Sequence, residues 1–139
     1  MPVFFHNSNF NYKLKNKQSL KSWVKSIIEG TGYKLGDINY IFTSEEEILR
    51  INNEYLKHNF YTDIITFPYS HDKVISGEIY ISIPTVQYNA KKFNQSFELE
   101  LNRVIAHGVL HLVGFDDKTK EDQKLMREQE ELWLAKLIH

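Results

Sequence analysis

Two histidines and an aspartate late in the sequence have the residue types and the spacing of a metal-binding group. His107 and His111 lie four residues apart in the segment VIAHGVLHLVGFDD, and Asp117 follows the second histidine by six residues. Because four residues make slightly more than one helical turn, both imidazoles would lie on one face of a helix. Imidazole nitrogens and carboxylate oxygens are common zinc ligands, so we expect His107, His111 and Asp117 to bind one Zn²⁺ ion.

A glycine separates the second histidine from the aspartate and predicts how the chain turns back. Gly114 can adopt the left-handed conformation that ends a helix, with Phe115 packing against the helix end. The pattern H-x-x-x-H-x-x-G-x-x-D has the spacing of H-E-x-x-H-x-x-G-x-x-H, the signature of one class of zinc peptidases. Asp116 is the alternative third ligand, and the spacing of that signature favours Asp117.

Two positions depart from the peptidase signature and change the expected chemistry. Gly108 stands where the signature has the glutamate that acts as general base, which argues against a zinc peptidase of the usual kind. Asp117 stands where the signature has a third histidine. A carboxylate makes the site one unit more negative, so we expect a less Lewis-acidic ion and a higher pKa of the water bound to it. Met126 lies at helical spacing with Trp133, which predicts a core position for its side chain.

The composition predicts one soluble domain without disulfide bonds. The chain has 139 residues, of which 42% are hydrophobic and 25% charged, and its formal net charge is −1. These values are typical of a globular domain, and the net charge gives no indication of nucleic-acid binding. It has no cysteine, so any metal must be held by His, Asp or Glu. Without a membrane-span pattern or a convincing signal peptide, we expect a cytoplasmic protein.

The pattern of apolar residues predicts an α+β fold. We expect strands at residues 3–12, 37–43, 63–69 and 77–83, with the last two paired as a hairpin. We expect helices from a Ser19 cap to Gly30 or Gly32, from a Ser44 cap to about Leu56, near 85–94, at 97–113, and from a Thr119 cap to near Ile138. This order predicts a single domain over residues 1–139, with a mixed four-stranded sheet packed with about five helices.

The helix expected at 97–113 is the central one and ends at the metal site. Its apolar residues recur at spacings of three and four, which predicts a stripe that faces the core: Phe97, Leu101, Ile105, Val109 and Leu112. At ~100° per residue, His107 and His111 lie beside this stripe. We therefore expect the histidines at the edge of the core, partly shielded from water.

Three segments of the chain resemble the YbeY family of zinc-dependent bacterial endoribonucleases. HGVLHLVGFDD (107–117) resembles the family's HGxLHLxGYDH motif. INNEYLKHNFYTDIITFP (51–68) is similar to the family segment LN-x-x-YR-x-x-x-x-PTDVLSFP, and SGEIYIS (76–82) is similar to the family's LGDI-x-I strand. The segments follow the family's order at similar separations, and the resemblance spans nearly the whole chain.

The resemblance implies a function in RNA metabolism. Members of the family are α+β domains in which three histidines hold one zinc ion, and here the third position is Asp117. The implied activity is single-strand-specific endonucleolytic cleavage of RNA in rRNA processing, notably at the 3′ end of 16S rRNA, and in ribosome quality control. The implied partners are rRNA and ribosomal particles, and we expect neither membrane nor DNA binding.

The sequence gives only candidates for the RNA-binding residues and for the general base. The family's usual Arg is Leu56 here, which bears on RNA binding and cleavage, and Lys57 compensates only in part because it lacks the bidentate guanidinium. Lys57 and Arg103 are the candidate RNA-binding residues. No general base is identified, and Asp116 and His58 are the two candidates.

Basic residues occur in groups that could guide RNA to the site. One group lies in the first helix and just before it, and comprises Lys13, Lys15, Lys17, Lys21 and Lys25. A second group lies nearer the site, and comprises Lys91, Lys92 and Arg103. An ordinary solvated surface is the alternative. Thr62 and Asp63 could begin a strand that lines the site, or an ordinary strand.

Two other functions remain as alternatives to the ribonuclease. One is a zinc hydrolase of another substrate, such as a peptide or a small ester, against which Gly108 argues. The other is a ribosome-associated protein whose zinc is structural and whose nuclease activity is weak or absent, which the loss of the Arg at Leu56 favours. Two imidazoles and one carboxylate would also suit iron, nickel or cobalt.

Overall fold

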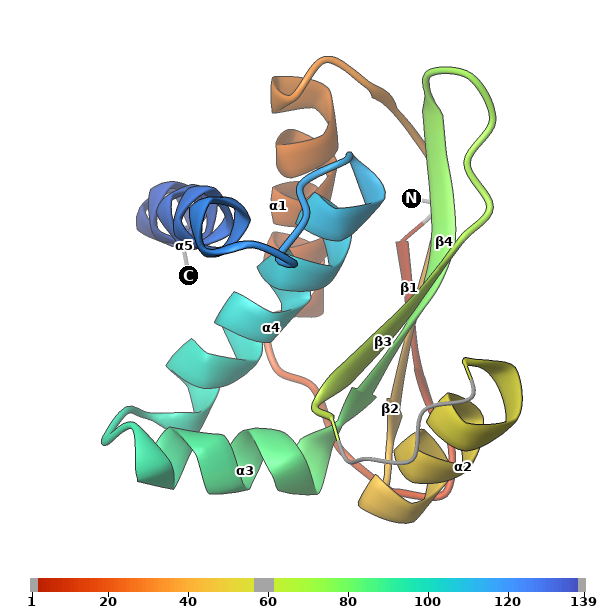
Figure 1. The fold of residues 1–139 in the computed structure, drawn as a ribbon, viewed down its shortest axis with the longest axis vertical. Coiled ribbons are helices and arrows are strands. Elements are labelled where there is room, and N and C mark those ends of the chain that lie inside the picture. Colours follow the sequence, from red (N-terminus) through yellow and green to blue (C-terminus); the bar gives the residue numbers. More distant parts are fainter. Residues whose placement is uncertain (1–2, 57–61, 138–139) are drawn as a thin grey trace.

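One sheet carries helices on both of its faces in the computed structural model, which describes residues 3–56 and 62–137 (Figure 1). The strands are β1 (Val3–Asn7), β2 (Lys34–Thr43), β3 (Ile64–Pro68) and β4 (Val74–Ser82). The helices are α1 (Lys17–Gly30), α2 (Glu45–Tyr55), α3 (Ile83–Lys92), α4 (Phe97–Leu112) and α5 (Lys120–Ala135). The predicted α+β class and the predicted order of strands and helices are confirmed.

The sheet is mixed and places β3 at an edge. The strand order is β1-β2-β4-β3, in which β1, β2 and β4 are parallel and β3 is antiparallel to β4. The predicted hairpin between the third and fourth strands is therefore confirmed. β3 has a strand neighbour on one side only, and α4 packs against both β3 and β4.

Successive side chains of β4 point alternately to the two faces of the sheet. Ile75, Ile79 and Ile81 are buried in the large core that α1 and α4 share with the sheet. Tyr80 points to the opposite face, where it packs against a small cluster that includes Ile48 of α2. Figure 1 shows α1 and α4 on one side of the sheet and α2 on the other. Because successive side chains of a strand point to opposite faces, the alternating residues of β4 contribute to the packing on both sides of the sheet.

Helix α4 is the central helix, as predicted, and α5 packs against it. Ser96 caps α4 by accepting a hydrogen bond from the backbone N–H of Leu99. The expected stripe is confirmed, although Phe97 and Leu112 at its ends are only partly buried. Burial extends beyond that stripe because α4 has the sheet on one side and α1 and α5 on others. Across the part of the chain that the structure describes, no helix is long and apolar enough to cross a membrane.

Several boundaries differ from the predictions. The first strand ends at Asn7, not at residue 12, and Asn9 has a positive φ of 59° that is incompatible with a continuous strand. The first helix begins at Lys17, with Asn16 as its N-cap, so the prediction of Ser19 as the cap was wrong. Asn16 has φ 59° and gives no side-chain hydrogen bond, which is why a search for a capping side chain missed it.

The remaining differences are smaller. The second strand begins at Lys34, three residues before the predicted start, because an irregularity between Leu35 and Ile38 interrupts the alternation that marks a strand. The third helix covers 83–92, not 85–94, and the last helix ends at Ala135, not near Ile138. The cap predicted at Thr119 is confirmed as a full capping box with Asp122.

Candidate metal centre

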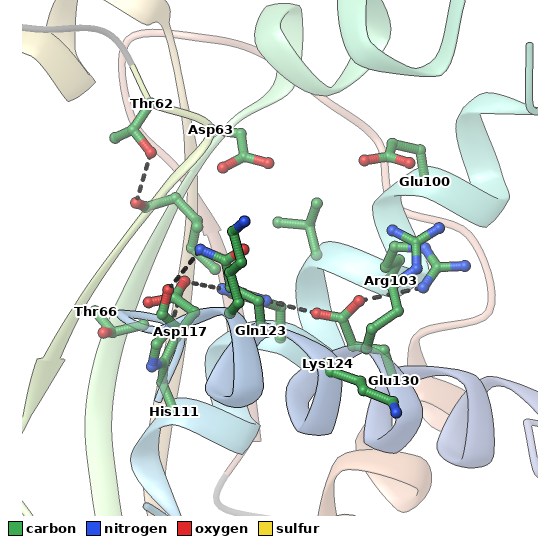
Figure 2. A pocket seen from close by; sticks show the side chains of 15 residues that line it. Thr62, Asp63, Thr66, Glu100, Arg103, His111, Asp117, Gln123, Lys124 and Glu130 are labelled. Carbon is green, nitrogen blue, oxygen red and sulfur yellow. Dashed lines mark hydrogen bonds and ion pairs between the residues drawn. The ribbon is translucent and has the colours of Figure 1, made fainter. Parts of the chain in front are cut away.

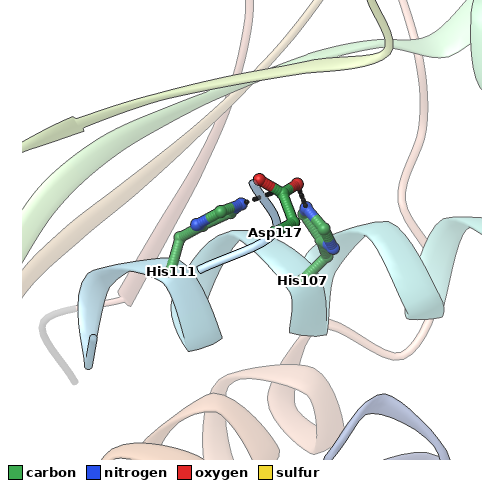
Figure 3. A group of neighbouring side chains, drawn as sticks. All are labelled: His107, His111 and Asp117. Carbon is green, nitrogen blue, oxygen red and sulfur yellow. Dashed lines mark hydrogen bonds and ion pairs between the residues drawn. The ribbon is translucent and has the colours of Figure 1, made fainter. Parts of the chain in front are cut away.

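The two histidines of α4 and Asp117 meet at one point, as the sequence predicted (Figure 3). The Nε2 atom of His107 lies 3.4 Å from Oδ2 of Asp117, and the Nε2 atom of His111 lies 3.3 Å from the same oxygen. One donor atom from each residue falls within 4.8 Å of the other two. Two imidazole nitrogens and a carboxylate oxygen in this arrangement suit one divalent ion with an open coordination position.

A tight turn after α4 brings Asp117 back to the histidines. Gly114 has φ +110°, and its N–H bonds to the carbonyl of His111 while the N–H of Phe115 bonds to the carbonyl of Leu110. This is the glycine-ended helix that the sequence predicted, and Phe115 packs against the core. The backbone carbonyl of Asp117 also accepts a hydrogen bond from Gln123 of α5. Backbone hydrogen bonds to α4 and a side chain of α5 therefore both hold the turn.

A residue that the sequence reasoning missed holds His107 in place. Oε2 of Glu130, on α5, lies 2.6 Å from Nδ1 of His107. Since Nδ1 then carries the proton, Nε2 of the neutral ring is left with its lone pair toward Asp117 and His111. A carboxylate on the second nitrogen of a ligating histidine orients the ring and makes it a stronger donor. Glu130 is 5% exposed, so this pairing is shielded from solvent.

Arg103 lies behind the histidine and pairs with two carboxylates, of which Glu130 is buried and Glu131 is exposed. Its Nη1 donates to Oε1 of Glu130 at 3.1 Å, and its Nη2 donates to Glu131 at 2.6 Å. The side chain of Arg103 is 10% exposed. Arg103 was predicted to bind RNA, and it does line the pocket, but two carboxylates already engage its guanidinium. Its position suits holding Glu130 in place better than gripping a phosphate.

The carboxylates around His107 favour its protonated form when no ion is present. Burial acts to lower the pKa of His107, but the hydrogen bond to Glu130 and the charges of Glu130, Asp63 and Asp117 outweigh burial. The pKa of His107 is therefore raised above its usual value of 6.5. A divalent cation would take the place of that proton, so the surroundings are prepared for positive charge.

The three donors open into a pocket of about 890 Å³ (Figure 2). One wall comes from the start of β3 and includes Thr62, Asp63 and Thr66. The other walls come from α4 and from the face of α5 that carries Gln123 and Glu130. Thr62 and Asp63 therefore line the site, but they precede the strand that they were expected to begin, because β3 starts at Ile64.

Two further carboxyl groups line this pocket. Burial raises the pKa of Asp63, with Glu130 and Asp117 adding to that effect and His107 opposing it. Burial also raises the pKa of Glu100, which is 6% exposed. In Figure 2 neither carboxylate forms a hydrogen bond or an ion pair with the other pocket residues. Carboxyl groups in such surroundings can hold a proton closer to neutral pH than exposed ones.

Gly108, which stands where zinc peptidases have their general base, faces the sheet. A Cβ atom at this position would lie 2.9 Å from Cγ2 of Ile79 and 3.0 Å from Cδ1 of Ile64. A glutamate side chain would have to displace the buried side chain of Ile79, which is 0% exposed. The close packing of α4 on the sheet therefore explains the glycine, and it removes the peptidase mechanism at this position.

Of the other predicted site residues, the structure describes Asp116, and it does not line the pocket. Lys57 and His58 lie outside the described residues. Asp116 is exposed, and its Oδ1 accepts a hydrogen bond from the backbone N–H of Asp117, so it supports the turn and is absent from the pocket lining. Leu56, at the position of the family's Arg, is 40% exposed at the end of α2.

All the residues of the two predicted basic groups except Arg103 lie away from the pocket. Lys91 and Lys92 are in the last turn of α3 and do not line it. The lysines of the first group lie on α1 or in the segment before it, and none of them lines the pocket either. Of the second group, only Arg103 reaches the pocket.

Comparison with known proteins agrees with this geometry. A model of the family described as Endoribonuclease YbeY matches residues 5–138. The chain belongs to the YbeY family. An Endoribonuclease YbeY of Parabacteroides distasonis is 42% identical over 135 residues, which are 97% of this chain and 95% of the relative. The Endoribonuclease YbeY of Flavobacterium johnsoniae is 46% identical over 131 residues, which are 91% of this chain and 94% of the relative.

A solved structure also resembles the chain over most of its length. The solution structure of TM1509 from Thermotoga maritima superposes with a TM-score of 0.67 at 29% sequence identity. The match covers 97% of this chain and 88% of the other. The chain therefore matches these two YbeY relatives over more than nine-tenths of its residues, and its fold is one that an experimental structure shares.

Proposed function

We propose that this chain is a zinc-dependent, single-strand-specific endoribonuclease that acts in rRNA processing, including 16S rRNA 3′ end maturation, and in ribosome biogenesis and quality control. The observation that carries the proposal is the His107, His111 and Asp117 cluster, whose donor atoms lie within 4.8 Å of one another at a large pocket in a YbeY family member. The relatives named as endoribonucleases support the reaction class. The proposed partners are rRNA and ribosomal particles in the cytoplasm.

The donor set supports zinc as the ion. Two imidazoles and one carboxylate form a three-ligand set like those of catalytic zinc sites, which leave a fourth position open. In such sites the ion activates a water molecule and polarises the phosphoryl group under attack. The chain's own residues prepare this site, because Glu130 orients His107 and the Gly114 turn positions Asp117.

Pocket carboxyl groups would handle protons during cleavage. The departing oxygen of a phosphodiester must acquire a proton, and the attacking group must lose one. Asp63 and Glu100 line the pocket, and burial raises the pKa of each, which favours the protonated form of both carboxyl groups more than in an exposed Asp or Glu. We assign this task to these two carboxyl groups in preference to Asp116, which does not line the pocket.

One comparison tests the proposal. Zinc-loaded wild type is assayed on structured rRNA and on casein beside His111→Ala, which removes a donor. His71→Ala is the matched control, because the His71 side chain is 93% exposed on the β3–β4 connection, away from the pocket. We expect RNA cleavage by wild type and His71→Ala, none by His111→Ala, and no casein cleavage by any of them.

Each other outcome favours a different function. Casein cleavage that His111→Ala abolishes would indicate a zinc hydrolase of another substrate class. Ribosome association by the zinc-loaded wild type without any RNA cleavage would indicate a binding protein with a structural ion. A zinc content far below one ion per chain in purified protein would contradict the proposed cofactor.

A further inference from the structure

Helix α5 presents three cationic side chains to the pocket that holds the metal centre. Lys120, Lys124 and Arg127 follow one another at intervals of four and three residues, the spacing of neighbours on one helical face. All three line the pocket, and all three are exposed. The stripe begins three residues after Asp117 and spans ~10 Å along the helix. It therefore leads away from the proposed ligands along one pocket wall.

The charges of this stripe are largely free of carboxylate partners. Lys120 and Lys124 form no ion pair within 4.0 Å with any residue that the structure describes. Arg127 approaches Glu131 at 3.8 Å, but Glu131 already pairs with Arg103 at 2.6 Å, and both members of the longer pair are well exposed. Arg103 is neutralised by the buried Glu130 and the exposed Glu131, whereas the exposed α5 cations can meet an anion from outside.

The lining of the pocket favours an extended polyanion. As many fixed cations as carboxylates line it, namely Arg103, Lys120, Lys124 and Arg127 against Asp63, Glu100, Asp117 and Glu130. A divalent ion would make the pocket net positive. No Phe, Tyr or Trp is among the described residues of the lining, so no base-stacking platform lies within it. Such a wall attracts the phosphates of a nucleic acid and offers no aromatic ring on which its bases could stack.

We propose that Lys120, Lys124 and Arg127 form a phosphate track on α5 that holds single-stranded RNA across the metal centre. The inference rests on the proposed function and deepens it, because it states where the substrate lies. Neighbouring phosphates of the strand contact the three cations, which places an adjacent phosphodiester beside Asp117. The track is sequence-tolerant, because it binds the backbone of the strand.

The chain provides a matched control for this track. Lys17, Lys21 and Lys25 on α1 are also spaced one turn apart, and none of them lines the pocket. The triple variants Lys120→Gln/Lys124→Gln/Arg127→Gln and Lys17→Gln/Lys21→Gln/Lys25→Gln remove the same charge from two helices. Glutamine has nearly the helix propensity of lysine and arginine, so both variants should fold. Zinc content and circular dichroism verify that they do.

The experiment measures RNA binding and cleavage separately. A fluorescein-labelled 12-nucleotide RNA is titrated with zinc-loaded protein at 4 °C by fluorescence anisotropy at several salt concentrations, and a denaturing gel confirms that the RNA is intact. Each single-strand phosphate contact contributes ~0.7 to the slope of log affinity against log salt. We expect the α5 variant to lose about 2 units of that slope and to bind roughly 10- to 100-fold more weakly. The α1 variant should behave as wild type.

A charge-keeping variant and the cleavage assay complete the test. Lys120→Arg/Lys124→Arg/Arg127→Lys should retain the wild-type salt slope, because the track recognises phosphate by charge. Equal RNA affinity and salt slope in the α5 triple variant and wild type would overturn the track, and so would failure of wild type to bind the RNA. Wild type that binds through α5 but does not cleave would support the track and contradict the proposed nuclease function.

Discussion

Replacing Glu130 with glutamine should weaken zinc binding although Glu130 is not a ligand. The two carboxylate oxygens serve two donors: Oε2 lies 2.6 Å from His107 Nδ1, and Oε1 lies 3.1 Å from Arg103 Nη1. Glutamine offers one acceptor oxygen and one NH₂ group, so one of the two donors must face another donor. Loss of such a partner behind a ligating histidine typically costs 10- to 100-fold in metal affinity, or about 1.4–2.7 kcal/mol.

The loss of zinc affinity in Glu130→Gln should increase with pH. In the apoprotein Glu130 raises the pKa of His107, so a proton competes with the ion when the pH is below that raised pKa. Glu130→Gln reduces this competition and also removes the orienting bond, while the charges of Asp63 and Asp117 still raise the pKa of His107. We therefore expect a larger loss of zinc affinity at pH 8 than at pH 6, because proton competition at His107 weakens the wild-type site more as the pH falls.

Competition with a chromogenic zinc chelator measures the affinity at both pH values. Glu131→Gln is the matched control, because Glu131 also pairs with Arg103 but makes no contact with His107. We expect Glu131→Gln to change zinc affinity less than about threefold, since an exposed ion pair contributes little. Wild-type zinc affinity in Glu130→Gln, or an equal loss in Glu131→Gln, would refute the idea that Glu130 acts through His107.

Three further predictions concern the ligand, the helix packing and the pH dependence of folding. Asp117→His should keep zinc and move the pH–activity midpoint to lower pH, because a neutral third ligand leaves the ion more Lewis-acidic; Asp117→Ala should lose most of its zinc. Gly108→Ala should lower the free energy of unfolding in urea by about 1–3 kcal/mol, because its Cβ would lie 2.9 Å from a buried isoleucine methyl. The apoprotein should melt at a lower temperature at pH 8 than at pH 5, because the folded-state pKa values of Asp63, Glu100 and His107 are all raised. Groups of this kind stabilise the fold at low pH, and that contribution is lost as the pH rises through their folded-state values.

Specific results would contradict these three expectations. An unchanged pH–activity midpoint in zinc-loaded Asp117→His would show that the third ligand does not set the acidity of the ion. A more stable Gly108→Ala would show that α4 can move away from the sheet at little cost, with the helix propensity of alanine deciding the outcome. If Glu100→Gln left the difference in melting temperature between pH 5 and pH 8 unchanged, Glu100 would not contribute to it.

The ligand cluster could be predicted from the sequence because it is local. His107 and His111 need only a helix between them, and Asp117 needs only the turn that Gly114 allows. The positions of these residues follow from helix geometry and from one backbone conformation. The same holds for the Thr119 cap, whose partner Asp122 lies three residues away. In each case the chain itself determines the distance.

Glu130 was missed because it lies 23 residues from His107 and meets it only through the packing of α5 on α4. A signal was nevertheless present in the sequence. Glu130 falls between Met126 and Trp133 at helical spacing, and those two apolar residues are buried in the core. A carboxylate on a stripe that faces the core must have a partner, since an unpaired buried charge is too costly. The identity of that partner is a property of tertiary structure.

The contacts between α4 and α5 link ion binding to the local unfolding in which α5 detaches from α4. Helix α5 provides none of the proposed ligands, yet it holds His107 through Glu130 and the Asp117 carbonyl through Gln123. An ion that binds only when these contacts are intact makes detachment of α5 less favourable, by an amount that grows with the ion concentration. Amide hydrogens of α5 should therefore exchange more slowly in the loaded protein, and a protease should cut this helix mainly when the ion is absent.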